Sequence, residues 1–145
     1  MFELMYSANG VGLAAPQVGW SARLFVMNPL GEEDSSGEKI YVNPEVSVPE
    51  GDVEEVSDEE GCLSIPGVRG NVIRRQRILV RALDSEGKPF EEEVSDLPAR
   101  VVQHELDHLD GILFITRLNT SDRMLVGKTL KQLEKEYKES LRAKR

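Results

Sequence analysis

The chain contains few histidine, cysteine and aromatic residues, and these low counts limit the classes of protein to which it can belong. A single cysteine among 145 residues excludes an internal disulfide framework and indicates a reducing compartment. No apolar run is long enough to span a membrane, and the first residues do not resemble a signal peptide. The net charge of −8 disfavours general or sequence-specific nucleic-acid binding. We therefore expect a cytoplasmic protein that can bury one core, without a membrane partner.

The two histidines both occur in one stretch of five residues, His104-Glu105-Leu106-Asp107-His108. On a helix, positions i and i+4 lie on one face, so both imidazoles can bind one ion while Glu105 points into the same space. Apolar neighbours, among them Val102 and Leu109, give the stretch a buried helical face. The pattern is typical of a hydrolytic metal site, although two core histidines would produce the same spacing.

A catalytic metal usually has three protein ligands, and the motif supplies two. The extended metalloprotease motif H-E-x-x-H-x-x-G-x-x-H matches through Gly111, but Phe114 stands where the third histidine would be. The glutamates at positions 134, 136 and 139 lie in a mixed-charge segment that is typical of a solvated surface. We prefer Cys62, because a thiolate binds borderline metals well; the alternative is a small buried apolar residue.

The loop from Gly10 to Gly19 also satisfies the dinucleotide-binding pattern Gly-x-Gly-x-x-Ala, with acidic Glu32 and Glu33 about twenty residues later. Its context argues against that reading, because residues 2–6 look like a helix end and Pro16 falls where the phosphate-binding helix would run. The segment is then best interpreted as a loop of small residues that lets another backbone approach closely, followed by the amide of Gln17. The alternative is a plain tight turn without a function.

Local patterns predict a mixture of strands and helices. Strands are expected at 24–27 and 41–42, each ending near an Asn-Pro pair, and within the acidic stretch 45–60, which can pair with the arginine-rich stretch 69–81. A hairpin is expected from 78–83 and 90–94. Ser95 or Asp96 would cap the motif helix and Gly111 would end it. Apolar residues at 125, 130, 133, 137 and 141 predict an amphipathic helix over about 121–145.

Three segments together resemble the signature motifs of peptide deformylase, in the family's order and at similar spacing. They are Gly10 to Gly19, Glu60-Gly61-Cys62-Leu63-Ser64, and Gln103 to Gly111. The resemblance extends from Met1 to about Leu118 and implies a single catalytic domain over 1–145. The implied fold is α+β, with small mixed or antiparallel sheets packed around a central metal-binding helix and a C-terminal amphipathic helix. The family's usual N-terminal segment is lacking, which suggests a fragment, an internal start or a compact lineage, and leaves an organellar location open.

The resemblance implies a metal-dependent hydrolase that removes the N-formyl group from the formylmethionine of nascent proteins and releases formate. Glu105 would move the proton, while the Gln17 amide and the Leu63 N–H would stabilise the oxyanion. The implied metal ligands are Cys62, His104 and His108, with Fe²⁺ favoured over Zn²⁺, Ni²⁺ or Co²⁺. The implied substrate-binding residues are Gly10, Val11, Gly12, Glu60, Gly61, Arg69, Leu97, Arg100 and Val101. Arg100 is a departure from the family, because many relatives have an aliphatic residue at this edge of the pocket. Glu60 and Arg74 would pair and brace the cysteine loop.

Two other functions remain as alternatives, a metallopeptidase that cleaves ordinary peptide bonds and a non-catalytic metal-binding fold. From Lys128 onward the chain has seven basic and three acidic residues, so this segment carries +4 and the remainder −12. The resemblance suggests that such a basic helix contacts the ribosome; a solvated helix face would have the same composition.

Overall fold

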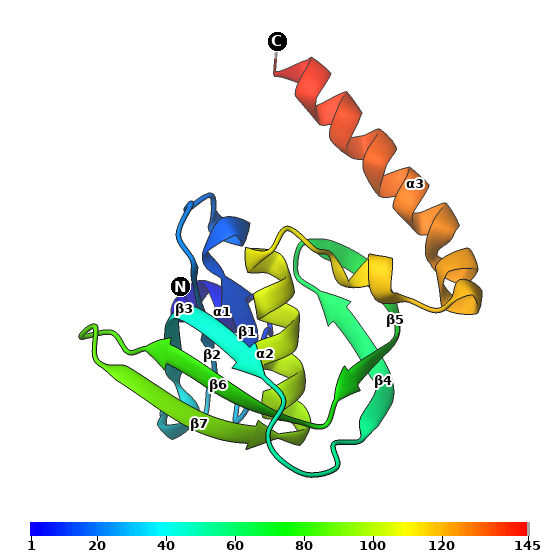
Figure 1. The fold of residues 1–145 in the computed structure, drawn as a ribbon. Helices are drawn as coiled ribbons and strands as arrows, with labels where there is room; N and C mark the ends of the chain where they lie inside the picture. The colour runs from blue at the N-terminus through cyan, green and yellow to red at the C-terminus, as the bar shows by residue number, and fades with distance from the viewer. Residues whose placement is uncertain (145) are drawn as a thin grey trace. The chain divides into compact units, whose positions relative to one another are not determined.

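The computed structural model describes residues 1–144, which form three α-helices and seven β-strands joined by short 3₁₀ turns (Figure 1). The helices are α1 (Phe2–Ser7), α2 (Asp96–Leu109) and α3 (Thr120–Ala143). The strands are β1 (Gly12–Ala14), β2 (Leu24–Met27), β3 (Lys39–Ser47), β4 (Glu55–Cys62), β5 (Ile65–Arg75), β6 (Arg77–Leu83) and β7 (Pro89–Ser95). The predicted α+β class, with antiparallel sheets and a C-terminal helix, is confirmed.

These residues group into two compact units, which we describe separately; the prediction of one catalytic domain stays a prediction. The first unit, Met1–Val56 with Ile73–Leu113, contains an antiparallel sheet in the order β1-β2-β3-β6-β7, and α2 packs on it (Figure 1). Successive side chains of a strand point to opposite faces of the sheet, so β6 buries every second residue against the helix. The shared core consists of Ala14, Phe25, Met27, Tyr41, Ile78, Val80, Ala82, Val94, Ala99, Val101 and Val102.

The local strand predictions hold in this unit, with one correction. β2 spans 24–27 as predicted, and β6 and β7 pair as the predicted hairpin. β3, however, does not end at its Asn-Pro pair: it continues to Ser47 with a register shift between Val42 and Glu45. Asn43 has φ 51°, a left-handed conformation that asparagine tolerates, so the pair forms a bulge inside the strand.

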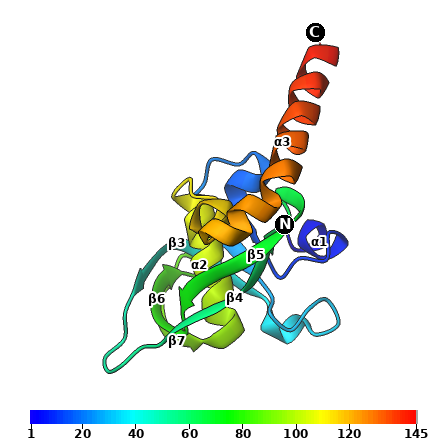
Figure 2. The ribbon, with the colours of Figure 1, turned by 90° about the vertical axis from the view of Figure 1, so that its right-hand side faces the viewer.

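The second unit comprises Ser57–Val72 and the described residues from Phe114 onward. β4 and β5 form a two-stranded hairpin, drawn side by side in Figure 2. The predicted pairing of acidic and basic segments occurs here, with Glu59 and Arg69 3.1 Å apart at an exposed position. Apolar residues of β5 and the start of α3 share a core that includes Ile65, Val68, Val72, Phe114, Leu118, Val126, Leu130 and Leu133.

Helix α3 agrees with the predicted terminal helix, but only part of its predicted apolar stripe is packed. Leu130 and Leu133 pack against the core together with Val126. The other three residues of the stripe are exposed, Leu125 at 76%, Tyr137 at 64% and Leu141 at 46%. Arg145, the last residue of the predicted helix, lies outside the described residues. No helix within residues 1–144 has both the length and the apolar character needed to cross a membrane.

The two ends of α2 differ in their agreement with the predicted caps. Gly111 follows the helix with φ 73°, as expected for a glycine that ends a helix. At the other end, no side chain caps the helix, contrary to prediction. Asp96 adopts φ 57°, and its carboxylate accepts a hydrogen bond from the side chain of Gln76, the residue between β5 and β6.

Candidate metal centre

Helix α2 presents both histidines on one face, as the spacing predicts. Their ring centroids lie 5.1 Å apart and the rings are inclined at 69°. Both residues are half-buried, whereas Val101, Val102 and Glu105 on the same helix are buried. Core packing therefore fixes the helix that carries the two imidazoles.

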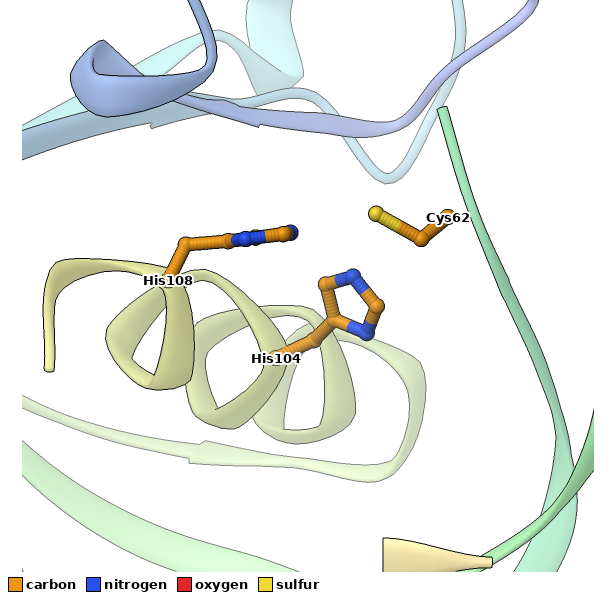
Figure 3. Close-up of side chains that lie close together, drawn as sticks. All are labelled: Cys62, His104 and His108. Atoms are coloured by element: carbon orange, nitrogen blue, oxygen red, sulfur yellow. The ribbon is translucent and has the colours of Figure 1, made fainter. Parts of the chain in front are cut away.

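Cys62, the last residue of β4, completes a group of three side chains that could hold a metal ion. It offers one sulfur and each histidine one ring nitrogen, and these atoms all lie within 4.8 Å of one another (Figure 3). Ligand atoms that share one tetrahedral ion at bond lengths of about 2.0 to 2.3 Å are roughly 3.5 Å apart, so the observed spacing is compatible with a single ion. Two imidazoles and a thiolate suit Fe²⁺, Zn²⁺, Ni²⁺ or Co²⁺ better than Mg²⁺ or Ca²⁺.

Glu105 lies directly beside Gly12, the first residue of β1, in a segment that was expected to be a loop. Its side chain is buried, with 4% of the residue exposed. A Cβ atom placed on Gly12 would be 2.5 Å from Glu105 Oε1 and 2.9 Å from Val101 Cγ1, closer than side chains tolerate. The absent side chain at position 12 therefore gives the carboxylate its space, which is a physical reason for glycine at this position.

Gln17 is held in a defined orientation. Its Oε1 accepts a hydrogen bond from the Ala14 backbone N–H at 2.8 Å. Because the oxygen end of the amide faces Ala14, the other end presents the NH₂ group, which is the donor end. Its position in the short 3₁₀ turn Ala15–Val18 follows from Pro16, whose fixed φ suits the first turn of a helix.

Arg74 forms a buried ion pair with a partner that no local pattern in the sequence indicates. Its Nη1 donates to Asp107 Oδ2 at 2.6 Å, and both side chains are at least nine-tenths buried. Asp107 lies inside the histidine motif, three residues after His104. This position was the only hint in the sequence that Asp107 has a role near the histidines. The pairing of Arg74 with Glu60, implied by the resemblance, stays a prediction.

Several of the remaining predicted substrate-binding residues have defined contacts or a defined exposure. Arg69 Nη1 would lie 2.9 Å from a Cβ at Gly61, so a glycine there makes space for the guanidinium. Arg100, predicted at a pocket edge, donates to the Val56 carbonyl at 2.7 Å. Val101 is buried, but three apolar side chains retain over a third of their surface: Val11 at 37%, Leu63 at 38% and Leu97 at 49%.

Comparisons with known proteins agree on one family. A family model described as polypeptide deformylase matches residues 1–124. The chain is 46% identical over 131 residues to a peptide deformylase of Thermodesulfovibrio yellowstonii, covering 90% of this chain and 78% of the relative. It is 42% identical to peptide deformylase 1B, chloroplastic/mitochondrial, of Arabidopsis thaliana, covering 96% of this chain and 50% of that protein. A crystal structure of the Plasmodium falciparum peptide deformylase superposes with a TM-score of 0.88 at 37% identity, covering 95% of this chain and 80% of the other.

Proposed function

Since the chain belongs to the peptide deformylase family, whose members are metal-dependent hydrolases that remove the N-formyl group from nascent proteins, we propose that Cys62, His104 and His108 hold the metal. The juxtaposition of their three donor atoms, within 4.8 Å of one another, carries this assignment. When bound, the ion would act as a Lewis acid that lowers the pKa of a water molecule and polarises the formyl carbonyl.

The protein's own groups would then move the proton and stabilise charge. Glu105 takes a proton from the attacking water, and the formyl carbon becomes tetrahedral. The developing oxyanion accepts hydrogen bonds from the Gln17 NH₂ group and the Leu63 backbone N–H. The carbon–nitrogen bond breaks as Glu105 returns the proton to the leaving nitrogen, giving formate and a free amino terminus. The orientation of the Gln17 amide, fixed through Ala14, supports its role as a donor.

The substrate would lie against the loop at Gly10, Val11 and Gly12, with backbone hydrogen bonds along this loop. An apolar pocket with Leu97 and Val101 would take the methionine side chain. Arg69 and Arg100 would contact the peptide further from the formyl group, and Glu60 would brace the cysteine loop through Arg74. The assignments of Gly10, Val11, Gly12 and Glu60 carry over from the family's motifs. Those of Arg69, Leu97 and Val101 follow from the wider resemblance, and Arg100 departs from the family at the pocket edge.

A formate-release assay with formyl-Met-Ala-Ser tests the proposal. Glu105→Gln should lower kcat/KM by about 10² to 10⁴-fold, the usual contribution of a general acid–base group. Glu136→Gln, the same substitution on an exposed face of α3, is the matched control and should leave the rate unchanged. Cleavage of an internal peptide bond in place of formate release would favour the metallopeptidase. Equal activity of Glu105→Gln and the wild-type chain would exclude the assigned role of Glu105.

The identity of the metal is a separate question, and we propose Fe²⁺. A thiolate with two imidazoles also suits Zn²⁺, Ni²⁺ and Co²⁺, so ligand type alone does not choose among them. Anaerobic purification followed by elemental analysis should yield about one Fe per chain. Zinc at that stoichiometry, in protein that releases formate at full rate, would contradict the proposal.

We also propose that α3 contacts the ribosome, where nascent formylated chains emerge. Basic side chains recur at spacings of three and four along it, at Lys128, Lys131, Lys135, Lys138 and Arg142. Such a stripe suits the phosphate backbone of RNA. Deleting residues 128–145 should abolish co-sedimentation with ribosomes; unchanged co-sedimentation would refute the proposed contact.

We propose that the protein is located in the cytoplasm. The alternative is an organelle, which the name of the Arabidopsis relative suggests.

A further inference from the structure

The segment proposed to bind the substrate backbone, residues 10–12, is held from two sides within the first unit. On one side, the Gly10 N–H donates to the carbonyl of Met5 in α1 at 2.8 Å. On the other side, the Val11 carbonyl accepts from the Asn28 N–H at 2.9 Å, which extends the β1–β2 pairing by one residue. β1 is the first strand in the order of its sheet, and β2 is its neighbour there. Helix α1 and the end of β2 therefore hold this segment in place.

Asn28, the residue that follows β2, has a buried side chain that binds several groups at once. The residue is 0% exposed. Its Nδ2 donates to the carbonyls of Gly31 and Asp34 at 2.7 and 3.0 Å, and to the Tyr6 hydroxyl at 2.8 Å. Its Oδ1 accepts from the Leu30 N–H at 3.1 Å. The loop after β2 is thus closed around this amide, and the same amide reaches α1.

These bonds fix the amide in one orientation. Backbone carbonyls can only accept and a backbone N–H can only donate, so the amide of Asn28 cannot be turned by 180° without losing its bonds to the loop. The Tyr6 hydroxyl donates its one proton to Glu38 Oε1 at 2.7 Å, which leaves its oxygen as the acceptor for Asn28. A Cβ atom at Gly37 would overlap Asn28 Oδ1, so the loop also encloses the oxygen end closely.

Asn28 joins the two elements that hold the substrate segment. Its backbone N–H binds Val11, and its side chain binds Tyr6, which belongs to the helix that holds Gly10. Helix α1 has six residues, and a helix this short depends on tertiary contacts for its position. Apolar packing of Met5 places the helix against the sheet. Packing has no preferred direction, whereas the hydrogen bond to Tyr6 does.

We propose that Asn28 and Tyr6 are positioning residues for the substrate segment, an inference that rests on the proposed function. Both residues lie outside the three motifs that carry the family resemblance. The backbone groups of residues 10–12 must face the peptide in a fixed register to bind it. A peptide that pairs with a segment already held in that register loses less binding free energy to ordering.

The expected effect is on substrate binding and not on the chemical step. The peptide backbone bonds lie away from the formyl carbon, so they are equally strong in the ground state and in the transition state. Weakening such bonds raises KM and leaves kcat unchanged. Gly12 stays paired with Met27 in the β1–β2 ladder, so the space beside Glu105 is kept.

The test compares Tyr6→Phe with Tyr137→Phe in the formate-release assay with formyl-Met-Ala-Ser. Each substitution removes one hydroxyl group and keeps the ring, and Tyr137 is a suitable control because it lies on α3 and is 64% exposed. Tyr6→Phe should raise KM by about 2- to 10-fold, the factor that corresponds to the loss of one hydrogen bond, with kcat unchanged. Tyr137→Phe should leave both constants at their wild-type values.

A second variant removes the whole amide. Asn28→Leu should raise KM by more than Tyr6→Phe does, because all the bonds of the side chain are lost; if it does not fold, Tyr6→Phe alone provides the answer. A role confined to stability would reduce the fraction of active enzyme, which lowers the apparent kcat and leaves KM unchanged. A wild-type KM for Tyr6→Phe therefore refutes the proposal. If the wild-type chain releases no formate, the proposed function itself fails, and the inference with it.

Discussion

Breaking the buried ion pair between Arg74 and Asp107 should cost far more stability than breaking an ion pair at the surface. Its nitrogen and oxygen are 2.6 Å apart, and the two side chains are 5% and 9% exposed. Arg23 and Asp110 have almost the same separation, 2.7 Å, but are 43% and 44% exposed. The two pairs have nearly the same separation, so we attribute any difference in the cost of removing one partner to burial.

The perturbation is Asp107→Leu, which removes the carboxylate beside a buried guanidinium. Removing one partner of a buried pair costs about 3–5 kcal/mol, because the remaining charge stays desolvated. That loss raises the ratio of unfolded to folded protein by roughly 10² to 10³-fold or more. Arg23→Met, which breaks the exposed pair, should cost no more than about 1 kcal/mol. The double variant Arg74→Met with Asp107→Leu should recover most of the loss, since apolar side chains often replace a buried pair without cost.

Urea unfolding of the metal-free proteins, followed by far-ultraviolet circular dichroism, provides the measurement. The single tryptophan, Trp20, is 54% exposed and would report folding poorly by fluorescence. The reasoning is refuted if Asp107→Leu loses no more stability than Arg23→Met. It is also refuted if the double variant is no more stable than Asp107→Leu, because the cost would then not come from the isolated charge.

Three other changes probe the site and the core. Gly12→Ala should lower formate release by about 10²-fold, since its Cβ would lie 2.5 Å from Glu105 Oε1, and full activity would mean that the carboxylate can move freely. Cys62→Ser should lower the metal content found by elemental analysis, and a full complement of metal would exclude the thiolate as a required ligand. Burial, followed by a hydrogen bond to a carboxylate, raises the pKa of Tyr41 well above its ordinary value of 10.0. The folded state then keeps a proton that the unfolded state loses, so the unfolding free energy should fall above pH 10 by up to about 1.4 kcal/mol per pH unit. Tyr41→Phe should make this decline shallower in urea titrations, and an equally steep decline would contradict the assignment.

Several elements were predictable because their signals are local. The strand at Leu24–Met27 and the β6–β7 hairpin follow from short apolar runs and a turn-forming sequence between strands. Strand β3 was predicted too short, because an Asn-Pro pair usually interrupts a strand. Its continuation depends on pairing with β6 beyond a bulge, and the residues of β6 lie far along the chain.

The same distinction applies to the site. The helical spacing of His104 and His108 predicted a shared face, because four residues correspond to about one turn of any α-helix. Cys62 was predicted as the third ligand because it was the best of the candidates and because the family resemblance implies it. That its sulfur lies close to the two rings depends on the tertiary structure. Asp107 was quoted within the motif, yet nothing local indicated which strand residue it would bind.

The types of the candidate ligands, the helical face that carries two of them and the family to which the order of the motifs points can all be read from the amino-acid sequence. Tertiary structure decided that Gly12 leaves space for Glu105, that Asp107 pairs with Arg74, and that Asn28 joins the end of β2 to α1. The physical reason is the range of the interactions. Periodicity and turn preference act over a few residues, whereas burial and long-range hydrogen bonds depend on which distant segments the packed core brings together.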